Sequence, residues 1–196
     1  MKKVLLLLSF FTILISVSAQ DKPEGLFINS KAPDFKGTDQ SGNAVSLKEL
    51  RKKGPVVVIF YRGNWCPYCN KQLSRLQDSL QLIRDKGATV VAITPEASAG
   101  ITKTVEKTKV TFPILYDADM KIAKGYGVSY QVDEKTQTRY KNFGIDLLEN
   151  NSQKGTAFLP VPAVYVVNKE GSVLYRYFNE DYKKRPSVAE ILAEIK

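Results

Sequence analysis

The sequence predicts an α/β protein in which helices cover a central β-sheet. From residue 55 onward, short apolar runs rich in β-branched residues alternate with longer segments whose apolar residues recur at helical spacing. The run from Pro55 to Tyr61, PVVVIFY, is almost continuously hydrophobic. Such a run is typical of a central strand that is buried on both faces of its sheet.

The other elements follow in order along the chain. Before the central strand, residues 32–50 predict two strands around a turn at 41–43 and then a short helix. Apolar residues at 73, 76, 80 and 83 predict a helix between 67 and 84. Further patterns predict strands at 88–95 and 112–117, a helix at 98–109, two strands within 162–178 around a turn at 168–171, and a terminal helix at 187–196.

Residues 126–159 show no sustained period and are rich in polar side chains. We interpret them as an insertion into a single domain that spans residues 28–196. Even without residues 1–19, the chain is long enough to bury a core without disulfide bonds.

The first 19 residues predict a secretory signal peptide. Lys2 and Lys3 precede a short apolar run, and Val17-Ser18-Ala19 is a small-residue cleavage pattern. The uncharged run is at the low edge of the roughly 20 residues that a membrane-spanning helix needs. We therefore expect an exported protein, periplasmic or secreted, that is not held in a membrane after cleavage.

The composition argues against several classes of function. The formal net charge is +9, but basic residues are scattered among acidic ones, so a nucleic acid is not an expected partner. The chain has no histidine, which removes the usual general base and most zinc sites. It also has no glycine-rich dinucleotide motif, so we expect no organic cofactor.

Both cysteines lie in the stretch YRGNWCPYC, residues 61–69. A disulfide that closes so short a loop adds little stability, which favours a redox role for Cys66 and Cys69. Cys66 lies between a strand and a helix whose first turn suits Pro67, so the helix N-terminus is expected to lower the pKa of the Cys66 thiol. Cys69 is placed to resolve a mixed disulfide. An inert bridge, a core-packing role and half of a metal site are the alternatives, although two cysteines without histidine cannot complete the usual zinc site, so we expect no metal.

These residues resemble the thioredoxin fold and, within it, the peroxiredoxin-like alkyl hydroperoxide reductase/thiol-specific antioxidant family. The similarity covers residues 28–195 and depends on the motifs APDF, SLKEL, VVVIFYRGNWCPYC, VVAITPE, FPILYD and PAVYVVNKEG. It implies a thioredoxin-like fold, with a central mixed β-sheet flanked by helices and an N-terminal β-hairpin extension. It also implies a redox-active cysteine site and a cis-proline opposite the cysteine turn. Pro162 matches that proline, with Pro160 as a competitor and an edge-strand stop as the ordinary alternative.

The chain departs from the peroxidase pattern of this family, Pro-x-x-x-Thr-x-x-Cys plus an arginine that polarises the peroxide. Counting back from Cys66 places Ile59 and Gly63 at the proline and threonine positions. Counting back from Cys69 places Arg62 and Cys66 there. Neither register supplies the threonine hydroxyl, so efficient peroxide reduction is not a firm expectation, and either sulfur could attack.

Four further residues and one segment are candidates for substrate binding. The strand predicted from Pro162 to Asn168 lacks the arginine of the peroxidase pattern, and Arg62 could replace it, although an arginine at a strand end is often only solvated or paired. Trp65 and Pro67 are expected beside the substrate groove. Tyr68 could line that groove or cover the thiols. Residues 175–187, YRYFNEDYKKRPS, could dock an acidic or protein partner, or form an ordinary strand end and loop.

The leading hypothesis is an exported thiol-disulfide oxidoreductase that cycles Cys66 and Cys69 between dithiol and disulfide. Its expected partners are proteins with thiols or disulfides, one of which supplies or accepts electrons. A thiol peroxidase that reduces hydrogen peroxide or alkyl hydroperoxides is the alternative within the enzyme class. A non-catalytic binding or metal-delivery module is the alternative from another class.

Overall fold

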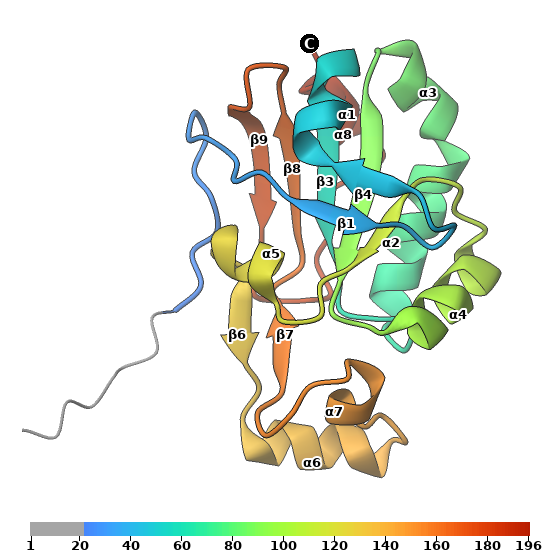
Figure 1. The fold of residues 1–196 in the computed structure, drawn as a ribbon, viewed down its shortest axis with the longest axis vertical. Helices are drawn as coiled ribbons and strands as arrows, with labels where there is room; N and C mark the ends of the chain where they lie inside the picture. The colour runs from blue at the N-terminus through green and yellow to red at the C-terminus, as the bar shows by residue number, and fades with distance from the viewer. Residues whose placement is uncertain (1–21) are drawn as a thin grey trace, which may run out of the picture.

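The computed structural model describes residues 22–196 (Figure 1). The predicted signal peptide, residues 1–19, lies outside the described residues. Between residues 22 and 196, no helix combines the length and the apolar character needed to cross a membrane.

A five-stranded mixed sheet forms the centre of the molecule, in the order β5-β4-β3-β8-β9. Its strands are β3 (Val56–Phe60), β4 (Thr89–Thr94), β5 (Ile114–Tyr116), β8 (Ala163–Val167) and β9 (Val173–Phe178). The first three are parallel, and β8 pairs antiparallel with both β3 and β9. Every residue of β3 is buried, which confirms the central strand expected from its continuous hydrophobicity.

Four helices pack on one face of the sheet: α2 (Pro67–Asp78), α3 (Leu80–Asp85), α4 (Ser98–Thr108) and α8 (Val188–Ala193). Leu73, Leu76 and Ile83 lie in the same buried cluster as Val57 and Ile59 of β3. The single helix predicted for residues 67–84 is interrupted at position 79, where the backbone leaves helical geometry between α2 and α3. The apolar spacing continues across this break, which explains why the sequence pattern did not reveal it.

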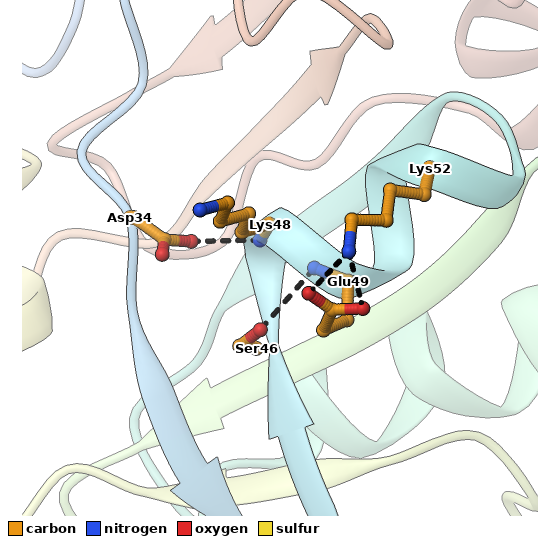
Figure 2. A network of polar contacts seen from close by, with 5 residues as sticks. All are labelled: Asp34, Ser46, Lys48, Glu49 and Lys52. Carbon is orange, nitrogen blue, oxygen red and sulfur yellow. Dashed lines mark hydrogen bonds and ion pairs between the residues drawn. The ribbon is translucent and has the colours of Figure 1, made fainter.

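The opposite face carries the N-terminal hairpin of β1 (Lys36–Thr38) and β2 (Ala44–Ser46), with α1 (Leu47–Lys53) and α5 (Lys121–Gly125), as Figure 1 shows. Figure 2 shows how the start of α1 is fixed. The backbone N–H groups of Glu49 and Lys48 donate to Ser46 Oγ at 3.2 Å and to Asp34 Oδ1 at 2.7 Å. These contacts satisfy helix donors that would otherwise lack partners and confirm the predicted hairpin and helix.

The segment without a sequence period, residues 126–159, is folded. Strands β6 (Ser129–Gln131) and β7 (Phe158–Pro160) pair antiparallel and enclose α6 (Glu134–Asn142) and α7 (Leu147–Asn150). Its small core contains Val132, Leu147, Ala157 and Leu159. Helix α6 buries no residue completely, so its sequence lacks the apolar spacing by which a helix is recognised.

The cis-proline expected at Pro162 is not present, because all peptide bonds in the described residues are trans. Pro162 is buried and lies between β7, which pairs with β6, and β8, which pairs with β3. Just before it, the Val161 N–H donates to the Val128 carbonyl at 2.7 Å. The chain thus passes from one β-ladder directly into the next, and the trans form is the ordinary preference of a proline bond.

Candidate active site

The cysteine turn connects the buried strand β3 to helix α2. Pro67 is the first residue of α2, where its missing N–H leaves no partner unsatisfied. Cys66 is the N-cap, and its Sγ accepts a hydrogen bond from the Cys69 N–H at 3.4 Å. The predicted sequence of strand, cysteine turn and helix is therefore confirmed.

The two thiols are in direct contact and differ in access. Cys66 Sγ and Cys69 Sγ lie 2.6 Å apart, and both cysteines are almost fully buried. Cys66 lines a pocket of about 420 Å³, whereas Cys69 does not. Cys66 is therefore the cysteine that faces the pocket, and Cys69 lies behind it.

The charge of the thiol pair is stabilised at Cys69. Burial opposes ionisation there, but the hydrogen bond with Cys66 and the positive charges of Arg185 and Arg62 outweigh it and lower the pKa of Cys69 to about 6. Arg185 Nη2 donates to Cys69 Sγ at 3.5 Å. The hydrogen bond with Cys69, burial and the negative charge of Cys69 together raise the pKa of Cys66.

The expectation of a lowered pKa at Cys66 is therefore wrong. The helix N-terminus does supply a backbone donor to Cys66, but the guanidinium of Arg185 donates to the neighbouring sulfur. Two adjacent buried sulfurs cannot both ionise readily, so the anion is held where the cation is nearest. The sequence did not indicate that Arg185, more than a hundred residues away, reaches this site.

We expect the reduced protein to form one thiolate with a midpoint near pH 6, because the pKa of Cys69 is lowered to about 6. Ultraviolet absorbance of the thiolate during a pH titration measures this, and the oxidised protein is the control. A lowered folded-state pKa stabilises the reduced fold at alkaline pH. That contribution is lost as the pH falls from the ordinary thiol range through about 6. A first thiolate step at the ordinary cysteine pKa of about 8.5 would contradict the assignment.

Arg62 is buried within the site and is surrounded by aromatic rings. Its guanidinium carbon lies 4.7, 5.4 and 4.2 Å from the ring centres of Trp65, Tyr140 and Tyr182. It also donates a hydrogen bond to the Tyr140 hydroxyl. Burial opposes its charge, but the nearby tyrosines and both cysteines raise the pKa of Arg62. Of the two roles considered for Arg62, the structure therefore supports a cation beside the thiols rather than a solvated strand end.

The loop before Cys66 is held by a buried carboxylate. Glu96 accepts hydrogen bonds from the Asn64 N–H at 2.7 Å and from Asn64 Nδ2 at 2.6 Å. Burial raises the pKa of Glu96 to about 7, although these hydrogen bonds oppose the shift. Gly63 has a φ of 154°, and an added Cβ would lie 2.7 Å from the Glu96 carboxyl carbon. The loop conformation therefore requires glycine at position 63.

The pocket beside Cys66 has aromatic and basic walls. Its lining residues are Arg62, Trp65, Cys66, Pro67, Tyr68, Arg139, Tyr140, Phe143, Ile145 and Tyr182. The predicted residues of the cysteine turn are thus brought together, with Cys69 behind them, and Pro162 is not part of the lining. Tyr68 is 39% exposed and packs edge-on against Tyr182, with 5.9 Å between ring centres.

Sequence reasoning missed the residues that distant segments bring to the site: Glu96, Tyr140, Tyr182 and Arg185. The only signal for two of them, Tyr182 and Arg185, was the mixture of aromatic and basic residues in 175–187, a segment considered for docking a partner.

Within residues 22–196, no group of three or more His, Cys, Asp or Glu side chains is arranged to hold a metal ion.

Comparisons with known proteins show which sequences and structures the chain resembles. Residues 28–176 match the sequence model of the AhpC/TSA family. A chloroplastic peroxiredoxin Q from Oryza sativa subsp. japonica is 31% identical over 83% of this chain and 64% of its own length. The thiol-disulfide oxidoreductase ResA from Bacillus thuringiensis subsp. konkukian is 24% identical over 84% of this chain and 77% of its own length.

One solved structure illustrates the shared fold. The peroxidoxin BcpB from Mycobacterium tuberculosis superposes with a TM-score of 0.67 and 20% identity, over 86% of this chain and 95% of that one. The chain spans less than two thirds of the length of the rice relative.

Proposed function

Because the chain belongs to the AhpC/TSA family and has its thioredoxin-like fold, we propose that it is a thiol-disulfide oxidoreductase that cycles Cys66 and Cys69 between dithiol and disulfide. One observation carries this proposal. Cys66 opens into a pocket, while Cys69 lies in contact behind it, with 2.6 Å between the sulfurs. This is the arrangement that a substrate-attacking thiol and a resolving thiol require.

The reaction proceeds by two thiol-disulfide exchanges. The proton shared by the pair moves to Cys69, and the Cys66 thiolate attacks one sulfur of a substrate disulfide. That step forms a mixed disulfide and releases the first substrate thiol. Cys69 then loses its proton and attacks Cys66 Sγ, which forms the protein disulfide and releases the second substrate thiol. An external dithiol returns the protein to its reduced form.

The walls of the pocket assist the first exchange. Arg62 and Arg185 provide positive charge beside the sulfurs, so a thiolate is available near neutral pH. Trp65, Tyr68 and Tyr140 offer aromatic surface to the group that carries the disulfide. The pocket of about 420 Å³ beside Cys66 offers room for part of a substrate next to this sulfur.

Export is part of the proposal, because the predicted signal peptide at residues 1–19 supports it. A periplasmic or extracellular setting is oxidising, so a dithiol there is consumed and must be renewed by another thiol protein. Thiol or disulfide proteins are therefore the proposed redox partners.

Peroxide reduction is a second candidate function. The observation that favours it is the Arg185 guanidinium, whose Nη2 lies 3.5 Å from Cys69 Sγ and places a cation beside the sulfur that one of the two registers makes the peroxide-reacting one. The peroxiredoxin Q relative supports the same possibility. In this reaction a cysteine thiolate attacks a peroxide oxygen and becomes a sulfenic acid, the alcohol or water leaves, and the second cysteine condenses to form the disulfide with loss of water.

A comparison of two assays tests both functions. Purified protein is supplied with dithiothreitol and either a protein disulfide, such as insulin, or hydrogen peroxide. We expect catalytic turnover of the disulfide and slower loss of peroxide, because neither register supplies the threonine hydroxyl of the peroxidase pattern, and Gly63 or Cys66 stands in its place. Faster peroxide turnover would make the second candidate the principal function. No turnover of either substrate would contradict both.

A further inference from the structure

A second cavity shares Tyr68 with the pocket beside Cys66. It has a volume of about 220 Å³ and lies between helix α2 and the segment that leads into α8. Its lining residues are Tyr68, Lys71, Gln72, Arg75, Leu76, Lys183, Arg185, Pro186, Val188 and Ile191. Tyr68 lines both cavities, and Arg185 connects this one to the thiols because its guanidinium also donates to Cys69 Sγ.

Four cations surround this cavity: Lys71, Arg75, Lys183 and Arg185. No carboxylate is among its lining residues, and none of the four forms an ion pair with a carboxylate within residues 22–196. Lys71, Arg75 and Lys183 are exposed, whereas Arg185 is partly buried. Arg185 also faces the Cys69 thiolate, but Lys71, Arg75 and Lys183 leave uncompensated positive charge next to the redox pair, so a negative group that enters the cavity would be attracted.

Two buried donors in this cavity also lack partners. Gln72 is 6% exposed, and its Nε2 has no hydrogen-bond partner in the described structure. The same is true of Arg185 Nε. A buried polar group without a partner costs free energy, so a ligand that accepts hydrogen bonds would be stabilised here. Leu76, Val188 and Ile191 add apolar surface, which suits an organic anion better than a fully hydrated inorganic one.

We propose that this cavity binds a carboxylate group of acidic thiol or disulfide substrates and so sets the charge preference of the enzyme. The proposal rests on the proposed thiol-disulfide exchange at Cys66. A carboxylate accepts hydrogen bonds from guanidinium and amide donors, and Arg75 and Arg185 can supply charge-assisted ones. Because Tyr68 is common to both cavities, a substrate whose disulfide lies at Cys66 can extend its acidic group past Tyr68.

The test compares two aromatic disulfides with the reduced protein. Dithiobis(nitrobenzoate) carries carboxylates, and dithiodipyridine is neutral. The measured quantity is the second-order rate constant for dithiobis(nitrobenzoate) divided by that for dithiodipyridine. It is compared in wild type, Arg75→Gln and Lys183→Gln. We expect each substitution to lower the ratio about two- to fivefold, the range of a partly exposed ion pair. Lys48→Gln removes the same charge from α1, on the opposite face of the sheet, and should leave the ratio unchanged.

The possible outcomes separate this inference from the proposed function. If both reagents react but the ratio is the same in Arg75→Gln, Lys183→Gln and wild type, the cavity does not select carboxylates and the inference is wrong. An equal fall in Lys48→Gln would show a general effect of net charge and would also overturn it. If neither reagent oxidises the wild-type dithiol, the proposed function fails, and the inference fails with it.

Discussion

Replacement of Cys66 by serine is expected to abolish disulfide turnover, with a loss on the order of a thousandfold or more. Cys66 is the sulfur that lines the pocket, whereas Cys69 is 0% exposed behind it. A serine hydroxyl is not a useful nucleophile without a general base, and the chain has no histidine to act as one. The insulin assay with dithiothreitol measures this loss.

Cys69→Ser is the matched variant, because it removes the other sulfur of the same contact. Cys66 can then still attack, but the resolving thiol is missing, so the mixed disulfide with the substrate should accumulate. Mass spectrometry of the protein after incubation with a small disulfide detects this adduct. The opposite pattern, with a stable adduct on Cys69 in the Cys66→Ser protein, would reverse the two roles and favour the register in which Cys69 is the peroxide-reacting sulfur.

The parts of the fold that could be predicted are those set by local sequence patterns. The central strand β3 is continuously apolar because both its faces are covered, and Pro67 indicates where α2 begins. The two cysteines of the turn are three residues apart, so their contact follows from the start of one helix. These relations need no knowledge of distant residues, and the structure confirms them.

The parts that could not be predicted depend on contacts between distant segments. Tyr140 lies on α6, a helix with no fully buried residue, yet its ring centre is 5.1 Å from that of Trp65. Arg185 lies in the segment before α8 and reaches Cys69 from there. Neither position has a local pattern that indicates its partner, because loop paths are set by the packing of the whole domain. The prediction that the pKa of Cys66 is lowered was wrong for the same reason.

Arg62→Met is expected to shift the dithiol–disulfide equilibrium toward the disulfide. Arg62 is 1% exposed and forms no ion pair with a carboxylate within residues 22–196. The thiolate of the reduced cysteine pair therefore acts as its counter-ion. Oxidation removes that thiolate and leaves the buried cation uncompensated. The charge of Arg62 therefore favours the dithiol, which makes the disulfide of the wild-type protein more oxidising.

A methionine keeps much of the apolar contact with the surrounding rings but carries no charge. We expect the reduction potential to fall by on the order of 30 mV, which corresponds to about a tenfold shift in this two-electron equilibrium. Equilibration with a series of glutathione redox buffers measures the potential. The thiolate midpoint of the reduced variant should rise from the value near pH 6.

Arg139→Met is the control for Arg62→Met, since Arg139 lines the same pocket but is exposed to solvent, where its charge is screened. It should leave both the potential and the thiolate midpoint unchanged. If Arg62→Met also leaves the potential unchanged, then the aromatic rings and the Tyr140 hydroxyl alone stabilise the guanidinium, and its charge does not depend on the redox state of the cysteines. A measured fall confined to Arg62→Met would instead show that this buried cation contributes to the reduction potential, which the cysteine motif alone does not fix.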